Sequence, residues 1–158
     1  MASESGGYVV LGGGIAGVTC AETLSILCPE ERILLITSSN LIKAVTNLQK
    51  ITKTLEVFDV KEKPHSVLEN RFPNIKVIHG SIVNINPELK EVSLSDNSTI
   101  GYSSLCVCTG GTPKLINKEN TYVLGIRDTE SVKVFQEKLQ NASRIAVVGN
   151  GGIATELV

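Results

Sequence analysis

Near the N-terminus, apolar residues form two unbroken runs on either side of a segment with helical spacing. The first run is Tyr8–Gly12, the second is Ile33–Ile36 within Arg32–Thr37, and neither alternates with polar residues. Between them, Ile15–Cys28 repeats apolar residues three or four positions apart, as on one face of a helix. Unbroken apolar strands joined by a helix predict a parallel sheet that is covered on both faces.

After residue 74 the apolar runs become shorter and more typical of strands. Gly80, Pro87 and the turn residues 96–98 interrupt them, which indicates a β-meander rather than another βα repeat. The expected strands are Ile75–Ile78, Val83–Ile85, Glu91–Leu94, Ile100–Tyr102 and a further buried strand at Leu105–Thr109.

The other segments carry weaker patterns. Before the meander, the expected elements are a helix over Asn40–Val57, a polar loop over 59–66 and a helical turn over Val67–Phe72. After it, they are an irregular connector over 114–127, an amphipathic helix over Thr129–Gln140, a strand over Arg144–Gly149 and a helix over Gly149–Val158.

Composition narrows the class of protein. The chain has 158 residues, a formal net charge of −1 and 42% apolar residues, which is an ordinary globular balance. No apolar run approaches the ~18 residues of a membrane helix, and the first seven residues lack the basic and apolar regions of a signal peptide. We therefore expect an intracellular protein that binds neither nucleic acid nor a membrane directly.

Gly12, Gly14 and Gly17 form a G-x-G-x-x-G motif between the first predicted strand and the helix. The first glycine permits a tight turn, the second lets the backbone approach a pyrophosphate, and the third lets the helix pack closely on the strand. The N–H groups at the helix N-terminus then favour phosphate. A glycine-rich turn without a ligand is the alternative, but the flanking strand and helix favour nucleotide binding.

The end of the second predicted strand departs from this motif. An acidic residue about 20 residues after the glycines normally binds a ribose hydroxyl, whereas this chain has Thr37, Ser38 and Ser39 there. Hydroxyl groups bind a ribose more weakly than a carboxylate does. Thr37 and Ser38 are the candidate ribose contacts.

Further segments resemble the pyridine nucleotide-disulfide oxidoreductase superfamily. The run Thr109-Gly110-Gly111-Thr112-Pro113 follows an apolar strand and resembles the T-G-x-x-P turn of that family. The run Gly149-Asn150-Gly151-Gly152-Ile153-Ala154 is similar to its second fingerprint, and residues 124–129 to the connector before it. Residues 14–22, 42–47 and 71–78 are similar to a divergent eukaryotic member.

The resemblance implies an α/β, Rossmann-like FAD-binding fold with a parallel sheet, helices and an inserted β-meander. It implies an incomplete FAD-binding domain at residues 1–141 and the start of an NAD(P)H-binding domain at 142–158. The implied FAD contacts are Gly12, Gly13, Gly14, Ile15, Ala16, Gly17, Ile82, Thr109 and Gly110. The implied NAD(P)H contacts are Gly149, Gly151, Gly152, Ile153 and Ala154.

The cysteines do not form the redox pair of the family's disulfide reductases. That pair follows the second strand, and residues 40–55 contain no cysteine. We interpret Cys20, Cys28, Cys106 and Cys108 as packing residues, with Cys106 and Cys108 on the same face of a strand. His65 and His79 have no metal-ligand spacing to these cysteines, so no metal site is expected.

Two charged residues, Lys43 and Arg127, each allow two interpretations. Lys43 falls where the family's chain passes the flavin, so it is either a flavin neighbour that stabilises the reduced ring or a solvated lysine at a helix start. Arg127 is either a cofactor-side residue or a surface charge. No catalytic acid or base is assigned.

Two hypotheses for the function follow. The first is an FAD-dependent oxidoreductase that passes electrons from NAD(P)H via flavin to an unidentified acceptor, seen here as its N-terminal part and truncated at the start of a second Rossmann unit. The second is a non-catalytic nucleotide-binding or interaction fragment, such as a short isoform or a truncated gene model. The resemblance also implies a cytoplasmic or nuclear location and a role in protecting tRNA ligase from oxidation.

Overall fold

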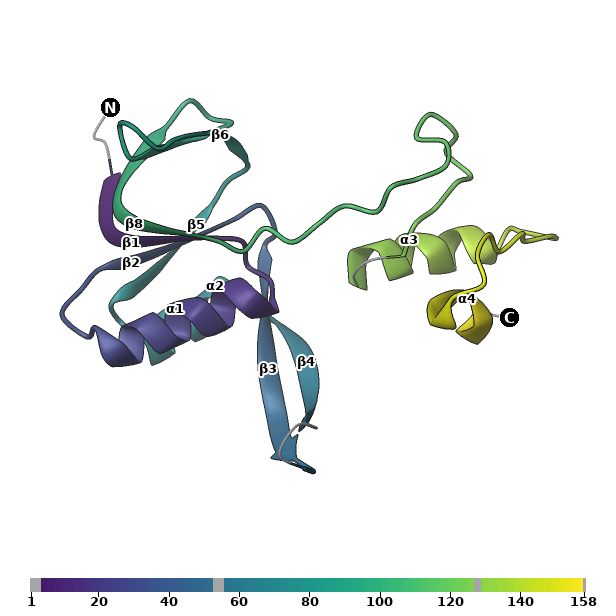
Figure 1. The fold of residues 1–158 in the computed structure, drawn as a ribbon, viewed down its shortest axis with the longest axis horizontal. Coiled ribbons are helices and arrows are strands. Elements are labelled where there is room, and N and C mark those ends of the chain that lie inside the picture. The colour runs from purple at the N-terminus through teal and green to yellow at the C-terminus, as the bar shows by residue number, and fades with distance from the viewer. Residues whose placement is uncertain (1–3, 53–55, 127–128, 158) are drawn as a thin grey trace. The chain divides into compact units, whose positions relative to one another are not determined.

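The computed structural model describes residues 4–52, 56–126 and 129–157 of the chain (Figure 1). It divides into two compact units, residues 1–110 and 111–158. The domain boundary expected at 141 and 142 stays a prediction. The elements are β1 (Glu4–Leu11), α1 (Ile15–Leu27), β2 (Ile33–Thr37), β3 (Leu41–Lys50), β4 (Glu56–Pro64), α2 (His65–Arg71), β5 (Ile75–His79), β6 (Ile82–Asn86), β7 (Glu91–Leu94), β8 (Thr99–Val107), α3 (Thr129–Leu139) and α4 (Gly152–Glu156).

The first unit is built on a sheet with strand order β5-β2-β1-β8-β7-β6. The pairs β5–β2, β2–β1 and β1–β8 are parallel, and the meander strands β7 and β6 continue the sheet in antiparallel pairs. Val10 of β1 lies opposite Leu35 of β2 and Cys106 of β8. The expected parallel sheet with an added meander is confirmed.

Both faces of this sheet are covered, as the unbroken apolar runs predict. On one face, Val10 and Leu35 pack against Val18 and Ala21 of α1. On the other face, Val9 and its sheet neighbours pack against apolar side chains of the meander, namely Val92, Leu94 and Ile100. In Figure 1, α1 and α2 lie on one side of the sheet, and the chain from β6 to β8 curves over the other. Each fully buried Leu or Ile stabilises the fold by about 1.5–3 kcal/mol.

Strands β3 and β4 pair with each other and are called the hairpin below, so the helix expected over Asn40–Val57 and the loop expected over 59–66 were wrong. In the hairpin, β3 and β4 are antiparallel, and Val45 lies opposite Val60. Asn47 adopts a φ of 54° where the register shifts. Cross-strand pairing of β-branched side chains overrides the weak helical spacing of this segment.

The last strand of the unit is longer than expected and less buried. The strands predicted at Ile100–Tyr102 and Leu105–Thr109 form the single strand β8, which ends at Val107. The expected burial was wrong at Val107, whose side chain is 59% exposed. The reason is that β7 pairs with β8 only over Thr99–Gly101, so the meander does not extend over the end of this strand.

In the second unit, the amphipathic helix is confirmed as α3, and the expected strand is absent. No described segment pairs with Arg144–Gly149, and a strand forms only where another strand accepts its backbone hydrogen bonds. The final helix begins three residues later than expected, at Gly152. Of the helices that the structure describes, none has the length and apolar character to cross a membrane.

Candidate functional site

The turn after β1 is fixed between its two neighbouring strands. Gly12 N–H donates to the Ile36 carbonyl at 2.7 Å, and Cys108 N–H donates to the Leu11 carbonyl at 2.8 Å. Gly12 itself has a φ of 109°, a conformation that residues with a Cβ atom rarely adopt. The chain therefore leaves β1 through a turn that requires glycine.

Close packing leaves no room for a side chain at three glycines of the turn. A Cβ at Gly12 would collide with the carbonyl oxygen of Cys108, and a Cβ at Gly17 would collide with the carbonyl oxygen of Gly12. A Cβ at Gly13 would lie 2.6 Å from Thr37 Oγ1. These contacts bring the N-terminal turn of α1 directly onto the end of β1, as the glycine motif predicts.

Gly14 differs from these glycines because the space in front of it is open. A Cβ at Gly14 would meet nothing within 4 Å. Gly14 is the N-cap of α1, its carbonyl accepts the Val18 N–H at 3.0 Å, and it makes no side-chain cap. Ile15 and Ala16 of the first turn are exposed, and this turn contains no acidic residue. A helix N-terminus with these properties suits an anionic phosphate group.

The hairpin is attached to the same turn through Lys43. The Lys43 N–H donates to the Gly13 carbonyl at 2.9 Å. Lys43 is half-buried within β3 and lies opposite Glu62, so the alternative of a lysine at a helix start does not apply. A contact between Lys43 and a flavin stays a prediction.

Thr37 and Ser38 occupy different environments at the end of β2. Thr37 is buried, its hydroxyl accepts the Ser39 N–H at 3.2 Å, and it packs against Gly13. Ser38 is exposed. Of the two candidate ribose contacts, Ser38 is thus the accessible one, while Thr37 supports the glycine turn.

Two histidines contact the backbone of Ser38 and Ser39, in the loop that follows β2. The sequence did not predict these contacts, because the histidines were considered only as metal ligands. The His65 Nε2 is 2.9 Å from the Ser39 carbonyl oxygen, and the His79 Nε2 is 3.1 Å from that of Ser38. His79 could have been suspected from its position at the carboxyl end of a predicted strand, where parallel sheets bind ligands. Nothing in the sequence indicated the position of His65.

The other implied FAD contacts divide between the turn and the core. Thr109 lies at the turn, since a Cβ at Gly12 would be 3.2 Å from Thr109 Cα. Gly110 follows with a φ of 70°. The Ile82 side chain instead packs against the apolar meander core. Its backbone follows Gly80, whose N–H donates to the Thr37 carbonyl at 2.9 Å.

The second glycine motif forms a similar local turn in the second unit. Gly149 has a φ of 140°, and Gly151 is the N-cap of α4, the short helix that includes Ile153 and Ala154. The Thr155 N–H donates to the Gly151 carbonyl at 3.1 Å. Contacts of Gly149, Gly151 and Gly152 with NAD(P)H stay predictions. Arg127 lies outside the described residues.

Three cysteines meet under the glycine turn. Cys106 Sγ and Cys108 Sγ are 3.5 Å apart on the face that packs against α1, which confirms that they share a face. Burial, together with a hydrogen bond to Cys106, raises the pKa of Cys20 to about 11 and also raises the pKa of Cys108. Protonated, half-buried thiols are unreactive packing groups. Within the described ranges, no group of three His, Cys, Asp or Glu could hold a metal ion.

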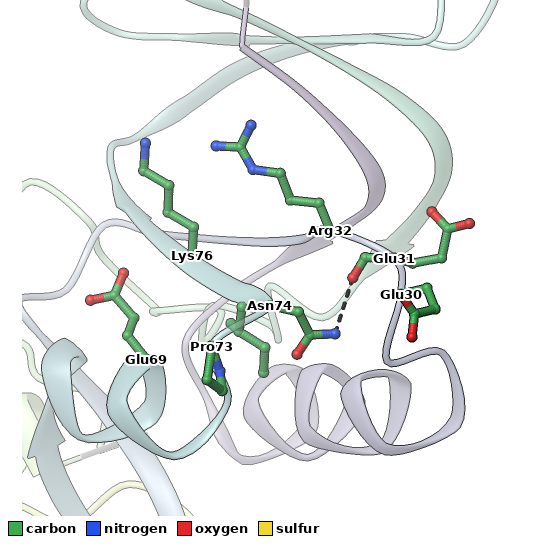
Figure 2. Close-up of a pocket in the computed structure, with 8 residues that line it drawn as sticks. Glu30, Glu31, Arg32, Glu69, Pro73, Asn74 and Lys76 are labelled. Carbon is green, nitrogen blue, oxygen red and sulfur yellow. Dashed lines mark hydrogen bonds between the residues drawn. The ribbon is translucent and has the colours of Figure 1, made fainter.

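A cavity of about 580 Å³ lies at the opposite ends of the same strands (Figure 2). It is lined by Arg32 and Lys76, at the amino ends of β2 and β5, and by the carboxylates of Glu30, Glu31 and Glu69. Ligands of parallel sheets bind at the carboxyl ends of the strands. The mixed charge of the lining also gives no preference for an anion, so the glycine turn is the better candidate site.

The chain matches one protein family over nearly its whole length. Residues 7–158 match the family described as pyridine nucleotide-disulphide oxidoreductase. The chain is 54% identical over 156 residues to pyridine nucleotide-disulfide oxidoreductase domain-containing protein 1 of Rattus norvegicus, covering 99% of this chain and 31% of that protein. Its identity to the Homo sapiens protein is 53% over 154 residues, with 98% and 31% covered. The chain thus spans about a third of the length of these relatives.

Solved structures support the same fold. NADH:rubredoxin oxidoreductase from Clostridium acetobutylicum superposes with a TM-score of 0.74 at 20% identity, over 98% of this chain and 41% of that one. Sulfide:quinone oxidoreductase from Aquifex aeolicus superposes with a TM-score of 0.60 at 26% identity, over 88% and 32%.

Proposed function

Because the chain belongs to the pyridine nucleotide-disulphide oxidoreductase family, we propose that its Gly12–Gly17 turn holds the pyrophosphate of FAD. The observation that carries the proposal is the contrast between the glycines. Gly12 and Gly17 are packed against backbone, whereas Gly14 faces open space at the N-terminus of α1. Of these three positions, Gly14 is the one with room for a ligand, and the residues around it fit an anion.

Each part of the turn has a distinct task in this proposal. The backbone N–H groups of Gly14, Ile15 and Ala16 donate to phosphate oxygens at the helix N-terminus. Ser38 offers a hydroxyl to the adenosine ribose at the end of β2. Thr109 packs against Gly12 and closes the other side of the turn. Bound FAD supplies a flavin that accepts a hydride and passes electrons on.

We propose that the complete activity belongs to a protein longer than these 158 residues. Relatives that are three times as long carry oxidoreductase in their names, and the chain covers 31% of them. The proposed reaction takes electrons from NAD(P)H, bound at the Gly149–Ala154 turn, to an acceptor. A cytoplasmic or nuclear location and a role beside tRNA ligase are proposed from the resemblance. Imaging of a tagged protein tests the location, and co-precipitation with tRNA ligase tests the association.

The test of FAD binding is the visible spectrum of the purified chain. Flavin absorbance that co-purifies with the protein, or that is recovered after adding FAD and removing the excess, is the expected result. Bleaching by NADPH or NADH under anaerobic conditions would extend the proposal to electron transfer by this chain. A chain that binds FAD without bleaching is the non-catalytic nucleotide-binding fragment. A colourless folded chain that takes up no FAD would contradict the proposal.

A further inference from the structure

Two imidazoles from separate elements hold the loop that follows β2. His65 is the first residue of α2, and His79 is the last residue of β5. Their Nε2 atoms lie 2.9 Å and 3.1 Å from consecutive carbonyl oxygens, those of Ser39 and Ser38. The ring centroids are 6.4 Å apart. The backbone of Ser38 and Ser39 is therefore hydrogen-bonded by side chains of two separate elements.

The acceptors determine which ring nitrogen carries hydrogen. A carbonyl oxygen only accepts hydrogen bonds, so both Nε2 atoms must donate. The loop is also closed from within, because the Ser39 N–H donates to Thr37 Oγ1 and the Leu41 N–H donates to Ser39 Oγ, each at 3.2 Å. The path of the backbone through Ser38 is thus fixed by hydrogen bonds on both sides of that residue.

This loop adjoins the glycine turn. Thr37, which precedes it, packs directly against Gly13. The chain has no carboxylate from Thr37 to Asn40, and the accessible polar side chain next to Thr37 is that of Ser38. A serine hydroxyl binds a ribose more weakly than a carboxylate, so its contribution depends on being held in place.

We propose that His65 and His79 are positioning residues for the adenosine end of the bound dinucleotide. By donating to the carbonyls of Ser39 and Ser38, they hold the Ser38 hydroxyl at the end of β2, where the ribose of FAD binds. The inference rests on the proposed function. It assigns ribose binding, for which the motif normally uses a carboxylate, to Ser38, which the two imidazoles hold in place. The hydrogen-bond donor, rather than the aromatic ring, is the property that this role requires.

The test compares a variant that lacks both donors with one that retains them. H65A/H79A removes both donors, whereas H65Q/H79Q keeps a side-chain N–H near each Nε2 position. The matched control is N86A, which removes a side-chain acceptor of two backbone N–H groups in the turn after β6. Fluorescence titrations give the dissociation constants of FAD and of FMN, which lacks the adenosine.

The expected result is a weakening of FAD binding by about tenfold in H65A/H79A, with FAD binding by H65Q/H79Q and N86A within about threefold of the unmodified protein. FMN binding should stay the same in all four proteins. Equal FAD affinity in H65A/H79A, or a parallel loss of FMN affinity, would overturn the positioning role while leaving the proposed function intact. Failure of the unmodified protein to bind FAD would overturn both.

A second measurement covers the case in which the double variant does not fold. In the unmodified protein, titration with adenosine diphosphate should shift the imidazole NMR signals of His65 and His79. Titration with inorganic pyrophosphate, which has no ribose, should not. Imidazole signals that ignore adenosine diphosphate while the amide signals of α1 respond to it would contradict the inference.

Discussion

The carbonyl oxygen of Gly12 occupies the space that a side chain at Gly17 would need. This relationship joins the end of β1 to the first turn of α1. Gly14 of the same motif faces open space instead, so the proposed function assigns packing and binding to different glycines. The two tasks can be separated by mutation.

Gly17→Ala should destabilise the protein, and Gly14→Ala should not. Alanine at position 17 forces the helix away from the strand, at a cost of about 1–3 kcal/mol in the free energy of unfolding. Alanine at position 14 meets no atom, and the φ of −75° there suits any residue. Urea denaturation measures the stabilities, and FAD titration should show that G14A has lost affinity because its methyl group projects into the proposed phosphate site. Equal stability of the two variants would contradict this account.

Glu69 should protect the outer edge of the sheet. Its Oε1 accepts the Val77 N–H at 2.9 Å, on the edge strand β5. E69A should lower the free energy of unfolding by about 1 kcal/mol and speed hydrogen exchange at the Val77 amide. E69Q, which retains an acceptor, and N70A, at the next residue of α2, serve as controls and should exchange like the unmodified protein. Unchanged exchange in E69A would show that the bond does not protect this edge.

Asn74 should be a structural residue rather than part of a binding site, although it lines the cavity in Figure 2. Its Oδ1 accepts the Ser25 hydroxyl at 2.5 Å, and its Nδ2 donates to the Glu31 carbonyl at 3.0 Å. N74A should cost about 2 kcal/mol of stability. A double-mutant cycle with S25A should give a coupling energy above about 0.5 kcal/mol. Additive effects would mean that the two side chains act independently.

Cys20 should resist alkylation at mildly alkaline pH. Its pKa is raised from 9.0 to about 11, mainly by burial. At pH 8.5 its thiolate is therefore about 75 times scarcer than that of an unperturbed thiol, and iodoacetamide should react correspondingly slowly. Peptide mass spectrometry against a free-thiol standard measures the rate. Reaction at the rate of the standard would contradict the raised pKa.

The same shift predicts how stability depends on pH. The folded protein holds the Cys20 proton more tightly than the unfolded chain does. The contribution of Cys20 is therefore fully present below pH 9 and is lost as the pH rises toward about 11. Denaturation midpoints of the protein and of C20A should converge over this interval. Midpoints that stay parallel across it would exclude Cys20 as a source of the dependence.

The central strands and the glycine turn could be predicted because their signals are local. Val9 and Leu34 stand in unbroken apolar runs, and such runs occur where both faces of a parallel sheet are covered. The glycine positions follow from the backbone path of the turn, and their packing agrees with the motif.

The hairpin and the histidine contacts could not be predicted because they depend on residues far apart in the sequence. Val45 is paired with Val60, and this pairing decides the structure of a segment whose own spacing is ambiguous. His65 meets Ser39 only because the hairpin returns the chain to the end of β2. Because Asn40–Val57 was expected to be helical, the sequence did not predict that the chain returns to the end of β2.

The most direct test of the central claim is the response of backbone amide NMR signals to FAD. The account predicts that FAD shifts the amide signals of Gly14, Ile15 and Ala16 at the N-terminus of α1. It predicts no change at Arg32 and Lys76, which line the cavity at the opposite ends of the strands. Shifts confined to Arg32 and Lys76, or an absence of any shift at the glycine turn in the presence of excess FAD, would contradict the account.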